Sequence, residues 1–193
     1  MIKPFNLVIL LSGAGSNALN LIGHFHDKTY FDKHTFVSKV ISNNPDAKGL
    51  LKAQSKGVKT AILNHKDFIR REDFDSVLAN LVLESSPNLI LLAGFMRVLS
   101  EAFLSRIKVP ILNIHPSLLP LHKGAHAIED SFKDASQFGG VSVHYVTKEL
   151  DSGAILVQEK IPKASNIKDY EKDIHDLEYK LYVEAVLKVL KGS

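Results

Sequence analysis

The amino-acid sequence predicts an α/β fold built on a doubly wound, mostly parallel, Rossmann-like sheet, with an antiparallel strand pair near the C-terminal end. In the first part of the chain, short apolar runs recur with helix-like segments between them. Parallel strands that are covered on both faces by crossover helices have this pattern. Further along, two β-branched segments are joined by the turn KELDSG, and strands connected in this way pair antiparallel.

Five apolar runs are expected to form the parallel strands. They occupy residues 5–11, 35–41, 60–64, 88–94 and 109–114. The segments between the runs carry apolar residues at helical spacing, so helices are expected at about residues 17–26, 47–56, 72–85 and 101–106.

The pattern changes after the last of these strands. Two prolines and Gly124 indicate a loop, which is followed by an expected short helix at residues 127–133. The segments GVSVHYV and AILVQEKIP are the expected antiparallel pair. Apolar residues at helical spacing between Ile167 and Val189 predict a long closing helix.

Length and composition favour a single domain that spans residues 1–193. The chain contains no cysteine, which excludes a disulfide framework and a thiolate metal site or nucleophile. The net charge of +3 is spread along the chain, which argues against duplex nucleic acid as a partner and suits a small anionic ligand. The apolar run at residues 7–11 is too short for a signal peptide or a membrane span. We therefore expect a cytoplasmic protein with no membrane partner, either a monomer or a weak homodimer.

The turn SGAGSN follows the first expected strand and opens the first helix. Backbone N–H groups and the helix dipole favour an anion at this place, and Gly13 and Gly15 would let the backbone approach a phosphate. The spacing is neither GxGxxG nor a P-loop, and the second strand ends in SNNPD rather than in an acidic residue placed for an adenosine ribose. A monophosphate fits better than a dinucleotide. The alternative is an ordinary tight turn.

The stretch NIHPSLLP ends the fifth expected strand, at the edge where open α/β sheets bind ligands. Strand alternation would place Asn113 and His115 on the same face. A side-chain amide and an imidazole side by side are suitable donors for an oxygen that becomes negative in a tetrahedral intermediate. Pro116 would fix the backbone beyond them. The alternative is a turn-capping asparagine and a satisfied, half-buried histidine.

Asp151 lies in the turn between the two antiparallel strands, where its carboxylate can approach the end of the fifth strand and keep His115 protonated. An ordinary turn residue is the alternative. Arg97, just after the fourth strand, lies on the same binding edge, unless it is only a solvated surface charge. A zinc site is a further alternative, although no local ligand spacing supports it; its candidate ligands are His115, His122, His126, His144 and Asp151.

Taken together, these segments resemble the phosphoribosylglycinamide formyltransferase family. The motifs SGAGSN, ISNNPDAKGL, LAGFMRVLS, ILNIHPSLLP, GVSVHYVTKELDSGAI and EKIP occur in the family's order and spacing over nearly the whole chain. The resemblance implies that the amine of glycinamide ribonucleotide attacks the formyl group of 10-formyltetrahydrofolate. It implies the folate as a co-substrate and no metal.

The resemblance also assigns roles to individual positions. Asn113 and His115 would stabilise the oxyanion, with His115 as the general acid, and Asp151 would keep His115 charged and help to move protons through water. The ribonucleotide would be bound by Gly15, Ser16, Asn17 and Glu178. The folate would be bound by Arg71, Met96, Arg97, Val98, Leu99, Asn113, Thr147, Lys148, Glu149, Leu150 and Asp151, with Arg70 as an alternative to Arg71 for its glutamate tail.

Two departures from the family pattern fall in the loop after the fifth strand: the usual tyrosine-proline before Gly124 is missing, and Ala127 replaces the second histidine. We expect the loop at residues 121–138 to become ordered only when ligands bind. The nearest rival function is a formyltetrahydrofolate deformylase, but that family resembles HHSFLP where this chain has HPSLLP. A non-catalytic folate or nucleotide binding module is the other rival, and the presence of the three catalytic residues argues against it.

Overall fold

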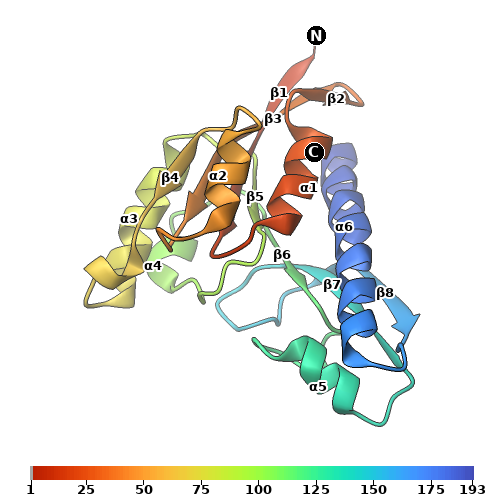
Figure 1. The fold of residues 1–193 in the computed structure, drawn as a ribbon. Coiled ribbons are helices and arrows are strands. Elements are labelled where there is room, and N and C mark those ends of the chain that lie inside the picture. The colour runs from red at the N-terminus through yellow and green to blue at the C-terminus, as the bar shows by residue number, and fades with distance from the viewer. Residues whose placement is uncertain (1) are drawn as a thin grey trace. The chain divides into compact units, whose positions relative to one another are not determined.

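The computed structural model describes residues 2–193 and contains the predicted alternation of strands and helices (Figure 1). The fold class is α/β with a mostly parallel sheet and the antiparallel pair, as the sequence predicts. The residue contacts divide the chain into two compact units, Met1–Leu112 and Asn113–Ser193. The single domain expected from the composition stays a prediction.

In the first unit, β1 (Lys3–Leu11) lies at the centre of the sheet, between β3 (Lys33–Ser42) and β5 (Leu89–Leu92), and pairs parallel with both. Leu7 to Leu11 have no exposed surface. Because side chains alternate between the two faces of a strand, both faces of β1 must be covered. This explains why the central strand is a continuous apolar run.

Two short strands complete this sheet. β4 (Thr60–Ile62) pairs parallel with β3, as expected from the apolar run at residues 60–64. β2 (Lys28–Tyr30) pairs antiparallel with β3 and was not predicted. Its three residues are mostly exposed and include a lysine, so no apolar run marked it.

Four α-helices connect these strands: α1 (Ser16–Phe25), α2 (Lys48–Gln54), α3 (Arg71–Leu83) and α4 (Glu101–Leu104). All four lie within about two residues of their predicted bounds, and α2, α3 and α4 each end two residues early. A short 3₁₀ turn, η1 (His65–Asp67), precedes α3. Helices α1 and α2 contact each other, as do α3 and α4.

The second unit contains the end of β6 (Ile111–His115), the antiparallel strands β7 (Phe138–Tyr145) and β8 (Ile155–Pro162), and two helices. The strand order is β6-β7-β8. The short helix α5 spans Ala127–Lys133, the predicted residues. The long helix α6 spans Ile167–Gly192 and contacts β7, β8 and α5.

The apolar stripe of α6 is its buried face. Tyr170, Ile174, Leu181, Ala185 and Leu190 are nearly or fully buried, while most charged residues of the helix are on its other faces. Charged residues recur in every turn of α6, and nowhere in residues 2–193 is there a helix with the length and apolar character that crossing a membrane requires.

Candidate active site

The end of β6 brings Asn113 and His115 to the same face of the strand, because side chains two residues apart point the same way. His115 is only 5% exposed. Hydrogen bonds from β7 and β8 hold the following turn. Ser142 Oγ donates to the Ser117 carbonyl at 2.6 Å, and Gln158 Nε2 donates to the Leu119 carbonyl at 3.0 Å. Strand β6 therefore ends against a fixed turn rather than in a free loop.

The turn between β7 and β8 directs Asp151 inward. Asp151 adopts a left-handed backbone conformation, with φ of 46°, and only 8% of the residue is exposed. Two residues on, a Cβ atom at Gly153 would lie 1.7 Å from the carbonyl oxygen of Tyr145. No other residue fits there without moving the backbone, so Gly153 keeps the turn tight against the end of β7.

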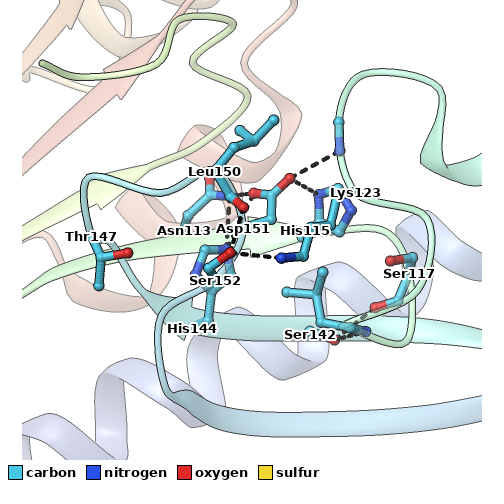
Figure 2. Close-up of polar contacts among 12 residues, drawn as sticks. Asn113, His115, Ser117, Lys123, Ser142, His144, Thr147, Leu150, Asp151 and Ser152 are labelled. Carbon is cyan, nitrogen blue, oxygen red and sulfur yellow. Dashed lines mark hydrogen bonds and ion pairs between the residues drawn. The ribbon is translucent and has the colours of Figure 1, made fainter.

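The carboxylate of Asp151 lies between the two side chains from β6, as Figure 2 shows. Its Oδ2 is 3.5 Å from His115 Nδ1, and its Oδ1 is 3.5 Å from Asn113 Nδ2. The backbone N–H of Gly124 donates to Oδ2 at 3.0 Å. The structure thus brings together the amide, the imidazole and the carboxylate that the sequence identified as candidates.

His144 belongs to this cluster, although the sequence identified it only as a candidate zinc ligand. Its Nδ1 lies 2.9 Å from the Tyr145 carbonyl oxygen, so Nδ1 must donate. Its Nε2 lies 3.2 Å from Asn113 Nδ2 and 3.5 Å from Asp151 Oδ1. Alternation along the strand GVSVHYV could have placed His144 on the inner face, but only the fold shows which residues it meets there.

The environment of Asp151 favours its ionised form. Burial acts to raise the pKa of this carboxyl, but the hydrogen bond with His144, the N–H of Gly124 and the charges of His115 and His144 together lower the pKa below its usual value. Asp151 is therefore a carboxylate at neutral pH, buried beside two imidazoles. Such a group can stabilise a positive charge on a neighbouring imidazole.

The loop at residues 121–138 is anchored by polar contacts, and its apolar packing is confined to α5, where the Phe132 ring lies 5.6 Å from the ring of Tyr170. Lys123 Nζ donates to Ser152 Oγ at 2.6 Å, and His122 Nε2 lies 2.6 Å from Asp134 Oδ2. On α5 only Ala127 and Ser131 are buried. Whether ligands order the loop stays a prediction, which hydrogen exchange with and without substrates measures.

In the first unit, the glycine turn leads directly into the N-terminus of α1. No side chain caps α1, and its first turn contains no acidic residue. Ser16 is exposed at the start of the helix, beside Gly15 and Asn17. A helix N-terminus of this kind favours an anion, and the anion site at this turn stays a prediction.

The structure gives Gly15 a reason that the sequence does not show, in addition to the expected approach to a phosphate. Gly15 has φ of 73°, and a Cβ atom there would lie 2.6 Å from the Cα atom of Gly49 on α2. Gly49 N also donates to the Gly13 carbonyl at 3.0 Å. Gly15 thus permits the close packing of two helices. At Gly13, by contrast, a Cβ atom would meet nothing within 4 Å, so its surroundings are open.

The segment after β5 contains the residues expected to bind the folate. Met96 is 72% exposed, and its N–H donates to Ser12 Oγ at 2.8 Å. Leu99 is 3% exposed, so its side chain belongs to the core and only its main chain could meet a ligand. The Arg97 guanidinium carbon lies 4.7 Å from the centre of the Phe74 ring, so Arg97 is packed on an aromatic face rather than freely solvated.

The two adjacent arginines at the start of α3 are in different situations. Arg70 forms two hydrogen bonds with Asp73, at 2.6 Å and 3.0 Å, and this raises the pKa of Arg70. Arg71 reaches only Glu72, at 3.9 Å. Arg71 is therefore the arginine with more freedom to bind another group.

The remaining candidates lie in the second unit. Glu178 is 5% exposed, and its Oε2 is 2.7 Å from His175 Nδ1. Thr147 to Leu150 form an exposed turn just before Asp151. Within residues 2–193, no group of three or more His, Asp or Glu side chains is arranged to hold a metal ion, so the zinc alternative gains no support from the structure.

Known proteins identify the class to which this chain belongs. Residues 5–186 match the family model described as formyl transferase, and the chain is a member of that family. Within it, the chain is similar to phosphoribosylglycinamide formyltransferases. The one from Escherichia coli (strain K12) is 41% identical over 169 residues, which cover 88% of this chain and 77% of that protein. The family predicted from the motifs is thereby confirmed.

A solved structure and a longer relative support the same family. The crystal structure of phosphoribosylglycinamide formyltransferase from Campylobacter jejuni superposes with a TM-score of 0.94 and 38% identity, covering 98% of this chain and 100% of that chain. The trifunctional purine biosynthetic protein adenosine-3 of Gallus gallus is 35% identical over 189 residues. The chain spans only 18% of that longer relative.

Proposed function

We propose that this chain transfers the formyl group of 10-formyltetrahydrofolate to the amine of glycinamide ribonucleotide. The products are formylglycinamide ribonucleotide and tetrahydrofolate, and the reaction belongs to de novo purine biosynthesis. The observation that carries the proposal is the cluster at the end of β6, in which Asn113 and His115 flank the buried carboxylate of Asp151. Membership of the formyl transferase family supports the same reaction.

In the proposed reaction, the amine nitrogen attacks the formyl carbon, and the carbonyl electron pair moves to the oxygen. The Asn113 amide and a protonated His115 are the donors that stabilise this oxygen as it becomes negative. The bond from the formyl carbon to N10 of the folate then breaks, N10 takes up a proton, and the former amine loses one. Asp151 keeps His115 charged and helps to move these protons through water.

We assign the binding of the substrates to the remaining candidates. The phosphate of the ribonucleotide would be bound at the N-terminus of α1 by Gly15, Ser16 and Asn17, and the ribose by Glu178. The folate would meet the main chain of residues 96–99 and the turn at residues 147–151. Its glutamate tail would pair with Arg71, which lacks the bidentate partner that Arg70 has.

One assay tests the proposal against its nearest rival. The protein is mixed with 10-formyltetrahydrofolate, with and without glycinamide ribonucleotide, and folate deformylation is followed. We expect turnover only with the ribonucleotide present, whereas equal turnover without it would identify a deformylase.

We also expect that a chelator leaves the rate of formyl transfer unchanged, and clear inactivation would revive the zinc alternative. A cytoplasmic location and a monomer or weak homodimer complete the proposal.

A further inference from the structure

The two ring nitrogens of His115 have different partners. Nε2 lies 2.8 Å from the carbonyl oxygen of His122, whereas Nδ1 lies 3.5 Å from Asp151 Oδ2. A carbonyl oxygen has no proton to give, so Nε2 must carry the hydrogen of this bond. A neutral His115 is therefore the Nε2–H tautomer, and a proton that the ring gains or loses is on Nδ1.

Nδ1 is also the nitrogen on the side of the other catalytic candidates. The carboxylate of Asp151 has one oxygen facing His115 Nδ1 and the other facing Asn113 Nδ2 (Figure 2). The two donors therefore approach the same small region from its two sides. A substrate oxygen that both donors reach would meet Nδ1, because Nε2 is turned away towards the loop.

A network of ionic groups holds the carbonyl that fixes this tautomer. His122 has a left-handed backbone, with φ of 52°, and its side-chain Nε2 lies 2.6 Å from Asp134 Oδ2. Lys163 Nζ binds the other oxygen of Asp134 at 2.5 Å. Ser117 Oγ donates to the Leu121 carbonyl at 2.6 Å and fixes the preceding residue. The position of the His122 carbonyl thus depends on the side chains of His122 and Ser117 and, through His122, on those of Asp134 and Lys163.

The network is only partly accessible to water. The side-chain exposures are 9% for Lys163, 19% for His122 and 27% for Asp134. The hydrogen bond from Lys163 is the main cause that lowers the pKa of Asp134 to about 2, so this carboxylate stays ionised at every pH where the enzyme would work.

We infer that Lys163, Asp134 and His122 form a positioning network that holds the His122 carbonyl against Nε2 of His115, and that Nδ1 is consequently the nitrogen that exchanges a proton with the substrate. The catalytic part of this inference rests on the proposed function. When His115 gives up its proton from Nδ1, the ring that remains is neutral and still bonded through Nε2–H. The three residues of the network do not touch the substrate and act only through His115.

The tautomer can be measured directly in the unaltered protein. Histidine labelled with nitrogen-15 gives separate NMR signals for protonated and unprotonated ring nitrogens. At a pH where His115 is neutral, assigned by comparison with His115→Ala, we expect a protonated Nε2 and an unprotonated Nδ1. The opposite tautomer in the wild-type protein would overturn the inference, whether or not any variant folds.

The network is tested by comparing two lysine variants in the same part of the chain. Lys163→Met removes the partner of Asp134, while Lys180→Met removes an exposed ion pair with Glu159, of 2.8 Å, that lies outside the network. We expect Lys163→Met to mix the two tautomers of His115 and to lower kcat by about tenfold, with both KM values within about twofold. Lys180→Met should change neither the tautomer of His115 nor kcat.

Rescue separates positioning from stability. Lys163→Arg retains a cation for Asp134, so we expect it to restore the Nε2–H signal and most of kcat. If Lys163→Met and Lys180→Met affect kcat and the NMR signals equally, the network has no positioning role. If the wild-type protein transfers no formyl group at all, the proposed function fails, but the NMR measurement still decides the tautomer.

Discussion

The cluster around Asp151 is buried and bonded within the protein, whereas the candidate ligand loops of the first unit have exposed residues and an uncapped helix N-terminus. Asp151 and His144 are 8% and 2% exposed, and each has several protein partners. Met96, by contrast, is 72% exposed, and the N-terminus of α1 has no side-chain cap. Groups that stabilise charge in a reaction gain from a fixed geometry, whereas groups that bind a ligand must leave room for it.

This contrast separates the kinetic effects of substitutions in the two regions. Changes in the cluster should lower kcat, because they remove stabilisation that matters most in the transition state. Changes in the loops should raise KM, because they remove contacts made equally to the bound substrate and the transition state. The predictions below test that separation, from the largest expected effect to the smallest.

The largest effects are expected in the cluster. His115→Ala and Asp151→Asn should each lower kcat by at least roughly a hundredfold while circular dichroism shows an intact fold. Because Asp151 acts through His115, the double variant should lose much less than the product of the two single effects. Near-wild-type turnover in either single variant would remove the catalytic assignment, and multiplicative losses would mean that Asp151 acts independently.

The two glycines of the anion loop should respond differently. Gly15→Ala forces a Cβ atom against Gly49 and a left-handed backbone, so it should lower the stability by about 1–3 kcal/mol and weaken ribonucleotide binding as well. Gly13→Ala meets no neighbour within 4 Å, so Tm should change little. If Gly13→Ala raises KM for the ribonucleotide and leaves Tm unchanged, the phosphate is bound at Gly13 and its neighbours. Equal losses of Tm in both variants would contradict the packing argument.

These glycines also show what could be predicted from sequence. The turn SGAGSN was sufficient to place a strand, a tight turn and a helix N-terminus, because each of these is a local property of the chain. The approach of Gly15 to Gly49 joins residues 34 positions apart, and nothing in the local sequence marks such a contact. Long apolar runs were likewise found, whereas the exposed three-residue β2 was not.

The candidate site shows the same division. Asn113, His115 and Asp151 could be chosen because of their positions at a strand end and in a short turn, where ligands bind in this class of fold. His144 and the carbonyl of His122 could not be assigned to the site in the same way. Their roles depend on how the antiparallel pair and the loop pack against β6, and a backbone carbonyl has no sequence signal.

A smaller effect is expected at the two arginines of α3. Arg71→Ala should raise KM for the folate by about three- to tenfold through loss of a charge-assisted contact with the glutamate tail, with kcat nearly unchanged. Arg70→Ala is the matched control, because Arg70 is already bonded to Asp73 and should affect stability rather than KM. The effect of Arg71→Ala should disappear with a folate that lacks the glutamate. A larger rise in KM for the folate in Arg70→Ala than in Arg71→Ala would assign the glutamate tail to Arg70.

The smallest effect is expected at His175 of α6, half exposed and 2.7 Å from Glu178 Oε2. The hydrogen bond with Glu178 raises the pKa of His175 above its ordinary value of 6.5. A raised pKa in the folded state means that the contribution to stability is present below about pH 6.5 and is lost as the pH rises through the folded value.

His175→Gln should therefore lower Tm by about 1–3 °C at pH 6 and by less at pH 9, since the imidazole of the wild-type protein is then neutral. Lys172→Gln is the control on the same helix, because its exposed pair with Asp176, of 3.1 Å, keeps its charge over this range. Thermal unfolding of both variants at the two pH values measures the difference. A loss of Tm at His175 that is equal at pH 6 and pH 9 would show that the contribution of the His175–Glu178 pair does not depend on a charged imidazole.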